Sequence, residues 1–421
     1  MLDNDILSLY NEHLDEMPPP YSEFDETQLL FENTLPTLYP TDMVMATDGE
    51  LTTAQQLVRP GDHGISIQLE AIHQTIVHIY PDNENRYRGL ISVQAKFYHH
   101  HRQPSDDDPI YNHAPSINCE TSLNEKVNTL QHIFRPSTIS ENVCCSFKVI
   151  LPSSSSSDVV TTTGIFLPEL LLRLPSNTQL VVQNIKQGVL GRLDAAVIQG
   201  VIEMQSVVVD NLRLVTGDGS IDAIDVAVQA AAKFVAISGG VHLRQCTADK
   251  SIIIKTPEAK TSICSVISQR IDLYAGTKPI NADNVQAETI HATSNSGHIS
   301  MDCAAKELVI KTNSGPIRGA WNVSQLMDIT AVSAIVRGSV EFSGDAVRAK
   351  IRACGWPVSL AVNKEYLGHY NIRTVNSVVN FGLPRGTRYE NHSHWCQGVI
   401  GIAANVLDVE NANAPIVITA T

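Results

Sequence analysis

Aromatic residues are scarce in this chain of 421 residues. Phe, Trp and Tyr make up 5% of it, whereas hydrophobic residues as a whole reach 43%. A large globular core normally uses more rings, while the narrow interior between stacked sheets suits small and β-branched side chains. The composition therefore predicts an all-β protein with a core of Val, Ile, Leu and Ala. Between Ile185 and Lys350 the aromatic residues are Phe234, Tyr274, Trp321 and Phe342.

Recognisable cofactor and metal signatures are also missing. The eight cysteines show neither CxxC nor Cys/His ligand spacing, which favours reduced, buried thiols over a disulfide framework or a zinc site. His99–His101 and Asp106–Asp108 supply suitable ligand types, but adjacent residues on an irregular loop lack a fixed geometry. We therefore expect no cofactor, no metal and a solvated loop at this place.

Long hydrophobic runs and basic clusters are absent as well. No stretch of about 18 apolar residues exists, so no integral membrane segment is expected. The N-terminus has neither a basic nor an apolar signal region, which predicts a cytoplasmic protein. The first 58 residues hold 12 acids and no Lys or Arg, and the remainder is nearly neutral, so nucleic acid is not an expected partner.

The acidic N-terminal stretch, residues 1–60, is predicted to be a disordered arm, because prolines among acids cannot bury enough surface to fold alone. It contains a PPxY sequence, formed by Pro18, Pro19, Pro20 and Tyr21. Consecutive prolines pre-set the polyproline II helix, and the tyrosine fills the adjoining pocket of an aromatic groove. The motif resembles the ligands of WW domains, and this resemblance implies a WW-domain partner such as a HECT-type ubiquitin ligase or its adaptor. An inert proline-rich spacer is the alternative.

Two further short motifs overlap this arm. Tyr21–Phe24 resembles a YxxΦ sorting signal, and the stretch from Asp25 to Leu29-Leu30 resembles an acidic dileucine signal. Both are read on membrane cargo, and without a membrane span an acidic tail is the favoured interpretation. They leave a membrane-peripheral trafficking component as a third possibility.

One small pattern returns from about Leu212 to Phe342: a Gly/Ser/Asn turn, an apolar residue and an alternating segment. Clear copies are Gly217–Ile221, Ser238–Val241, Ser296–Ile299 and Ser314–Ile317. The apolar residues at 221, 241, 263, 280, 299 and 317 are about 17–22 residues apart, a period that indicates a stacked repeat. Each repeat has room for two or three short strands. A phosphate-binding loop is not expected here, because strands rather than helices follow the glycines.

These observations divide the chain into four parts. After the arm we expect a β-rich module over 61–183, a β-solenoid repeat region over 184–384, and a polar loop with terminal strands that close the solenoid over 385–421.

The stretch from Leu212 to Phe342 resembles the adhesin-like family of bacterial and fungal β-solenoid proteins, whose repeated S-G-x-I turns match Ser296–Ile299 and Ser314–Ile317. The resemblance implies a β-solenoid of no established activity. Fungal-type relatives often add a proline-rich N-terminal tail with a PPxY-like element, as in this chain.

An enzyme is the rival reading, since β-helices also house polysaccharide hydrolases and lyases. The segment from Asp62 to Ile67 superficially echoes one of their motifs. Glycoside cleavage needs two facing carboxylates, but Asp222 and Asp225 share one strand and Asp302 stands apart. The sequence therefore favours a non-enzymatic β-solenoid scaffold or interaction protein, with a secreted-type adhesin or a β-helix enzyme as alternatives.

Overall fold

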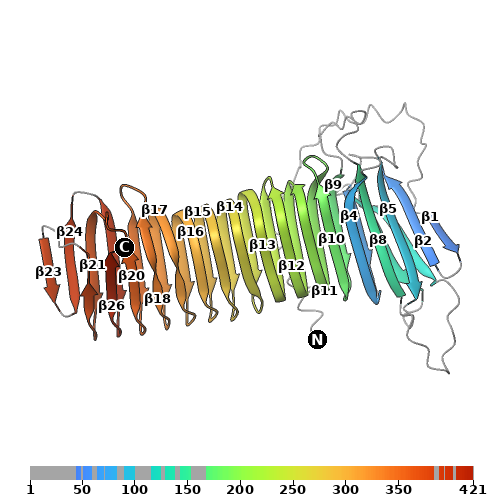
Figure 1. Ribbon diagram of the computed structural model, residues 1–421. Coiled ribbons are helices and arrows are strands. Elements are labelled where there is room, and N and C mark those ends of the chain that lie inside the picture. Colours follow the sequence, from blue (N-terminus) through green and yellow to red (C-terminus); the bar gives the residue numbers. More distant parts are fainter. Residues whose placement is uncertain are drawn as a thin grey trace, which may run out of the picture. The chain divides into compact units, whose positions relative to one another are not determined.

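The computed structural model describes residues 44–48, 51–58, 64–70, 72–82, 90–99, 115–124, 129–137, 143–152, 167–383, 388–392, 394–401 and 404–420. Within these ranges it contains strands and turns but no helix, and residues 43–421 form one compact unit. The unit is a β-solenoid of about 10 turns, which confirms the predicted fold class (Figure 1). We call each turn of the solenoid a coil.

The central coils follow one another in sequence order, and each pairs with the next in parallel (Figure 1). Their strands are long because the hydrogen-bonding pattern continues round the bends. They comprise β9 (Leu167–Leu174), β10 (Thr178–Ile185), β11 (Leu190–Val209), β12 (Asn211–Val228), β13 (Ala231–Thr256), β14 (Lys260–Ala275), β15 (Ile280–Ser294), β16 (Ile299–Thr312) and β17 (Ile317–Ala331).

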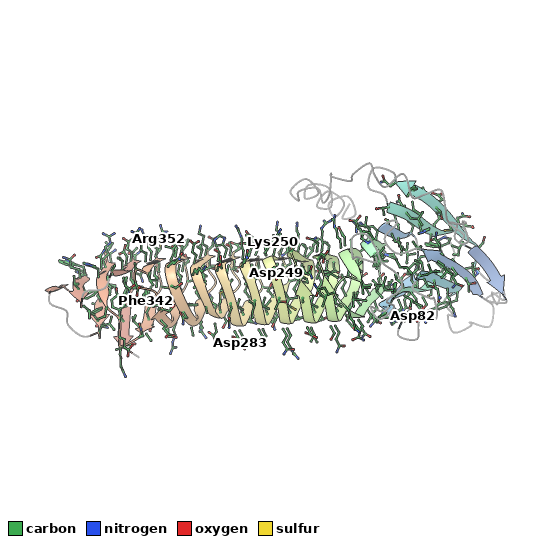
Figure 2. All side chains as sticks on the ribbon, turned by 90° about the horizontal axis from the view of Figure 1, so that it is seen from above. Asp82, Asp249, Lys250, Asp283, Phe342 and Arg352 are labelled. Carbon is green, nitrogen blue, oxygen red and sulfur yellow. The ribbon has the colours of Figure 1, made fainter. Side chains whose placement is uncertain are left out.

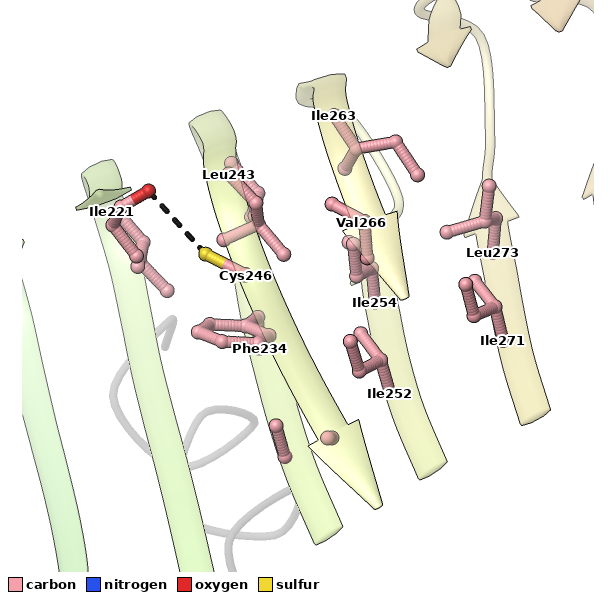
Figure 3. Packing of buried hydrophobic residues seen from close by; sticks show 14 of the residues in the cluster. Ile221, Phe234, Leu243, Cys246, Ile252, Ile254, Ile263, Val266, Ile271 and Leu273 are labelled. Atoms are coloured by element: carbon pink, nitrogen blue, oxygen red, sulfur yellow. Dashed lines mark hydrogen bonds between the residues drawn. The ribbon is translucent and has the colours of Figure 1, made fainter. Parts of the chain in front are cut away.

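Burial along one coil shows three sides. In the coil of β15, Ile280 and Ala282 point inward on side one, Val285 on side two, and Ile290 and Ala292 on side three. Alternation along each side is the period-2 rule of a strand with one face in the core. As the scarcity of aromatics predicts, inward positions hold mainly Ile, Leu, Val, Ala and Cys, with Phe234 among them (Figure 3).

The bend between sides one and two uses left-handed residues that are not glycine. Asp225, Gln245, Ser265 and Asn284 have φ between 51° and 56° and recur once per coil. Polar side chains suit this conformation because they hydrogen-bond locally. Two pairs of neighbouring bends are joined by hydrogen bonds, since Ser206 donates to Asp225 at 3.0 Å and Asn284 donates to Ser265 at 3.2 Å.

The bend between sides three and one has glycine in three successive coils, at Gly200, Gly219 and Gly239. Gly219 has a φ of 146°, and a Cβ there would lie 1.7 Å from the carbonyl oxygen of Gly200 in the preceding coil. Gly239 stacks on Gly219 in the same way. The corner role predicted for these glycines is therefore confirmed.

The predicted repeat register holds except at one anchor. Ile221 pairs with Val241 and Ile280 with Ile299, but Val241 pairs with Thr261 instead of Ile263. Thr261 occupies the inward position because its hydroxyl shares a hydrogen bond of 2.7 Å with the buried Thr256. A satisfied threonine thus replaces the expected aliphatic residue.

The N-terminal end of the solenoid departs from sequence order. Its parallel coil β3–β4 lies between coil β9–β10 and coil β7–β8. Strands β5, β2 and β1 extend the sheet beyond β8 in antiparallel fashion, and β6 flanks β7. The bounds are β1 (Val44–Asp48), β2 (Leu51–Val58), β3 (Gly64–Leu69), β4 (Gln74–Asp82), β5 (Ile91–His99), β6 (Ile117–Asn124), β7 (Thr129–Pro136) and β8 (Val143–Pro152).

Strands thus begin at Val44, before the expected end of the arm at residue 60. On β2, Thr52, Ala54 and Val58 are buried, so this stretch contributes an alternating strand despite its polar composition. The remainder of the expected arm lies outside the described residues.

The C-terminal end is also out of order. Coil β19–β20 is followed in space by β25–β26 and then by β21–β22, so the last strands lie one layer inside the end of the stack. Strands β24 and β23 flank β21 on the outer side. The bounds are β18 (Val336–Phe342), β19 (Arg348–Ala353), β20 (Val358–Val362), β21 (Gly368–Thr374), β22 (Val379–Phe381), β23 (Arg388–His392), β24 (Trp395–Ile400), β25 (Asn405–Asn411) and β26 (Ile416–Ala420).

Candidate interaction surface

The predicted partner-binding residues Pro18, Pro19, Pro20 and Tyr21 lie outside the described residues, so the structure leaves this site as a prediction. The solenoid itself presents its outer faces to solvent. The face with the densest array of charge is the outer side of side three, which we call the long face.

Three rows of side chains run along the long face, because residues two apart on a strand point the same way and coils stack in register. One row places Asp194 beside Arg213, and farther along it Asp272 beside His291. Figure 2 shows Lys250 and Arg352 along one edge of the stack and Asp283 along the opposite edge. Cations on the long face are Arg173, Arg192, Arg213, Lys233, Lys255, Arg270, Lys311, Arg348, Lys350, Arg352 and Arg373; acids are Glu169, Asp194, Asp272, Glu307, Asp328, Asp408 and Glu410.

The first cluster on this face surrounds Asp194, whose side chain is 1% exposed. Its carboxylate accepts hydrogen bonds from Arg173 at 3.0 Å, Arg213 at 3.2 Å and Arg192 at 3.3 Å. The three arginines come from three successive coils, so one carboxylate ties β9, β11 and β12 together. A buried carboxylate is tolerated only with such partners.

Glu169 completes the cluster and receives Arg192 at 3.1 Å. Burial raises the pKa of the Glu169 carboxyl, while the nearby guanidinium of Arg192 acts in the opposite direction. With both carboxylates ionised, the three arginines leave one positive charge in excess. The cluster therefore links neighbouring coils through charge-assisted hydrogen bonds.

The second cluster repeats this arrangement around Asp272, whose side chain is 6% exposed. Arg270 donates to it at 2.8 Å from the same strand, and His291 lies 3.2 Å away on the next coil. Arg192–Asp194 and Arg270–Asp272 thus share an Arg-x-Asp pattern with an inward Leu or Ile at the middle position. This recurrence is a sequence signal that locates both clusters, and it is not among the motifs predicted above.

The acids considered for the enzyme reading lie elsewhere on the surface. Asp222 accepts a hydrogen bond from Ser220 at 2.7 Å, Asp225 accepts one from Ser206, and Asp302 accepts one from the backbone of Ala320 at 2.8 Å. Each is thus engaged with nearby backbone or side chains. Gly64–Leu69 forms β3, whereas Asp62 and His63 are outside the described residues.

The His/Asp loop was the other place where the sequence offered metal-ligand residue types. Within the described part of the chain, no group of three or more His, Cys, Asp or Glu residues is placed to hold a metal ion. The His99–His101 and Asp106–Asp108 loop falls largely outside it.

The cysteines are all free thiols. Burial raises the pKa of the Cys246 thiol to about 11 and that of Cys303 to about 12. Cys246 lies in the core, where its Sγ is 3.6 Å from the carbonyl oxygen of Ala223 (Figure 3). These thiols are therefore small core residues and not thiolate nucleophiles.

One hollow of about 460 Å³ lies on the surface where β4 and β10 meet β11, and its lining includes His73, Asn177 and Glu203. Gln179 donates to Glu203 at 3.3 Å across it. No helix in the described ranges has both the length and the apolar character needed to cross a membrane.

One protein family matches part of this chain. The family described as Toastrack DUF4097 matches residues 155–325, which is less than half of the sequence. No curated protein matches the chain.

Two crystal structures are similar at low sequence identity. One, titled a "putative adhesin" from Bacteroides fragilis, is 10% identical, with 87% of this chain and 96% of that chain covered and a TM-score of 0.25. The other, a "putative cell adhesion protein" from Clostridium sporogenes, is 8% identical, with 89% and 100% covered and a TM-score of 0.15. The family match remains the one over residues 155–325, where the chain is similar to the Toastrack DUF4097 family.

Proposed function

We propose that this protein is a non-enzymatic β-solenoid scaffold that is recruited to a WW-domain protein through its N-terminal PPxY sequence. The observation that carries the scaffold role is the long face, whose parallel pairing continues from β9 to β21. It offers hydrogen-bonding and ionic groups at about 4.8 Å intervals from coil to coil. Such a surface is suited to extended partners with matching charge.

The recruitment role is supported by the sequence of the arm. It contains Pro18, Pro19 and Tyr21, and consecutive prolines favour the polyproline II conformation that WW domains bind, while a tyrosine can fill the adjoining pocket. The proposal places the protein in the cytosol, and its eight free thiols are in keeping with a reducing compartment. The proposed partner is a WW-domain protein such as a HECT-type ubiquitin ligase or its adaptor.

A binding titration of the full chain against a panel of WW domains tests this proposal. We expect selective binding in the micromolar range, weakened more than about tenfold by Tyr21→Ala, because a buried aromatic anchor carries much of such an interface. Tyr10→Ala, in the same acidic stretch but outside the motif, is the matched control and should bind as the unaltered chain does.

Equal binding by the Tyr21→Ala chain, or no binding by the intact chain, would overturn the recruitment role. The scaffold role would then be examined on the long face alone, by testing whether Lys233→Glu with Lys255→Glu abolishes capture of acidic peptides. Retention of every ligand by that variant would remove the long face as the binding surface.

A further inference from the structure

The C-terminal coil, which comprises β25 and β26 (residues 405–420), lies between two coils that precede it in sequence. β25 pairs in parallel with β19 on one side and β21 on the other. β26 pairs likewise with β20 and β22. Figure 1 shows β26 between β20 and β21. We call the space that this coil fills the slot.

The slot is apolar inside. Leu407, Val409, Ile416 and Ile418 point inward and are at most 1% exposed. Without them, the apolar core of the coils on both sides would be open to water, which is unfavourable. The slot therefore strongly favours being filled by a strand with this alternating pattern.

Polar groups fix which strand fits and in which register. On the β19–β20 side, Asn405 accepts from the backbone of Val347 at 2.8 Å, and Asn411 donates to the carbonyl oxygen of Trp356 at 2.8 Å. Asn413 donates to the carbonyl oxygen of Cys354 at 3.3 Å. Asn405 pairs in register with Gly368, and Asn411 pairs with Ala353 and Thr374, so the paired coils have no asparagine at these two positions.

Charge adds a second level of recognition. Asp408 lies in register between Lys350 and Asn371, and Glu410 between Arg352 and Arg373. Asn371 donates to Asp408 at 3.1 Å, and Arg373 donates to Glu410 at 2.8 Å. Slipping the strand by one residue would turn its apolar side chains outward and separate these pairs. The slot is thus built for one acidic strand.

The C-terminal coil also reaches the slot last. Both walls are complete in the chain before residue 405, whereas a central coil has covalent neighbours that are also its spatial neighbours. The connection from β24 to β25 spans residues 401–404 only. Gly401 has a φ of 69°, and a Cβ there would lie 2.6 Å from Leu367. Short, tight connections of this kind favour exchange of an element between identical chains.

We propose that the slot is a strand-acceptor site and that its ligand is the C-terminal coil of a second copy of this chain as well as its own. Two copies exchange their C-terminal coils and thereby form a dimer with the same contacts as the monomer. The exchange occurs while the slot is open, during folding or refolding. This inference does not depend on the PPxY proposal.

Cross-linking between two distinguishable chains tests the exchange. One full-length chain keeps Cys354 and Asn413, and the other carries Cys354→Ser and Asn413→Cys with a different tag. The two chains are refolded together and treated with a short cross-linker that joins two thiols. We expect part of the protein to move from the monomer band to a dimer band that contains both tags. A single chain with Cys354 and Asn413→Cys should cross-link internally, which establishes the reach of the linker.

A central pair of turns supplies the matched control. Asn313 donates to Asn295 at 2.8 Å across two coils that are adjacent in sequence. Chains with Asn295→Cys and with Asn313→Cys, both in a Cys354→Ser background, should remain monomers. An internal cross-link without a mixed dimer would overturn the exchange, and failure of the internal cross-link would overturn the slot itself. Equal dimer formation by the central control would also refute the proposal, because exchange would then not be specific to the slot.

Discussion

The central coils and the two ends of the solenoid solve the same packing problem in different ways. In the centre each coil stacks on its sequence neighbour, as β12 on β11 and β16 on β15. At both ends the coil nearest the chain terminus is not the outermost coil of the stack. A coil that is farther from that terminus in the sequence packs on its outer side. Coil β3–β4 is covered by β7–β8, and β25–β26 is covered by β21–β22.

The difference matters because a solenoid is stabilised mainly by contacts between neighbouring repeats, so its outermost repeats are held on one side only. Placing the terminal coil inside ensures that the outermost repeat is anchored by chain at both of its ends. Antiparallel strands β5 and β24 then cover edges that would otherwise invite pairing with another sheet. The central coils are thus stabilised by close stacking on their sequence neighbours, and the end coils by their out-of-order arrangement.

Breaking the close stacking of the centre should have the largest effect. Gly219→Ala places a Cβ 1.7 Å from a backbone oxygen of the preceding coil at a φ of 146°. We expect a loss of more than about 4 kcal/mol in the free energy of unfolding, or no folded protein. Urea unfolding followed by circular dichroism measures it.

Gly355→Ala is the matched control in an end turn. No atom lies within 4 Å of a Cβ built there, so a change below about 0.5 kcal/mol is expected. Similar losses for the two variants would show that the glycines of the central corner do not act through stacking.

Removing the carboxylate that ties three central coils together should have the next largest effect. Asp194→Asn removes the carboxylate that three arginines share, whose side chain is 1% exposed, and leaves Glu169 as the remaining carboxylate of the cluster. The expected loss is about 3–5 kcal/mol, the usual result of leaving buried charges uncompensated. Thermal and urea unfolding of the same variant give the value.

Asp328→Asn provides the comparison toward the C-terminal end. Its partner Arg352 is 43% exposed at the side chain and lies 3.0 Å away, so solvent screens the pair. We expect a loss below about 1 kcal/mol. The reverse order of the two losses would contradict the distinction between buried and solvated ties.

The sequence predicted the central coils better than the ends, because the signals of the central coils are local in the sequence. The repeated S-G-x-I turns and the alternation around Ile299 and Ile317 are local, so the coil period could be read from the sequence directly. Thr261 was misplaced because a buried hydroxyl paired with Thr256 cannot be distinguished from a surface threonine in one sequence. The slot of the C-terminal coil depends on pairing across 58 residues, between Val358 and Ile416, for which the sequence holds no local signal.

The candidate sites show the same contrast between local signals and signals that depend on the fold. Tyr21 and the prolines before it form a linear motif, which can be recognised in the sequence without a structure. The cluster around Asp194 exists only because the coil spacing brings Arg173 and Arg213 beside it. The Arg-x-Asp pattern is the part of the cluster that can be seen in the sequence. That Arg173 and Arg213 lie beside Asp194 follows only from the pairing register of neighbouring coils.

Acid should weaken the N-terminal end through His132. This residue is 0% exposed on β7, and burial lowers its pKa from 6.5 to about 4. Above pH 6.5 the imidazole is neutral in both states and has no effect. As pH falls from 6.5 to 4 the unfolded chain binds the proton more readily, so the free energy of unfolding falls by up to about 3 kcal/mol.

His132→Phe should remove this part of the pH dependence. Unfolding free energies of the variant and the unaltered chain, measured between pH 7.5 and 4.5, give the difference as a function of pH. A difference that is constant across the range would mean that His132 does not titrate as its burial requires.

The ion pair between Arg373 and Glu410 should show the smallest effect, and it separates recognition from stability in the slot. Arg373 is 57% exposed at the side chain, so Arg373→Gln is expected to lower the free energy of unfolding by less than about 1 kcal/mol. Arg373 also lowers the pKa of Glu410, so the contribution is present above pH 4.5 and is lost as the carboxylate is protonated below it. A variant that loses as much stability as Asp194→Asn would show that the slot is held by charge. A small loss, together with slower or less faithful recovery of the native C-terminal coil on refolding, would show that charge selects the strand while Leu407, Val409, Ile416 and Ile418 hold it.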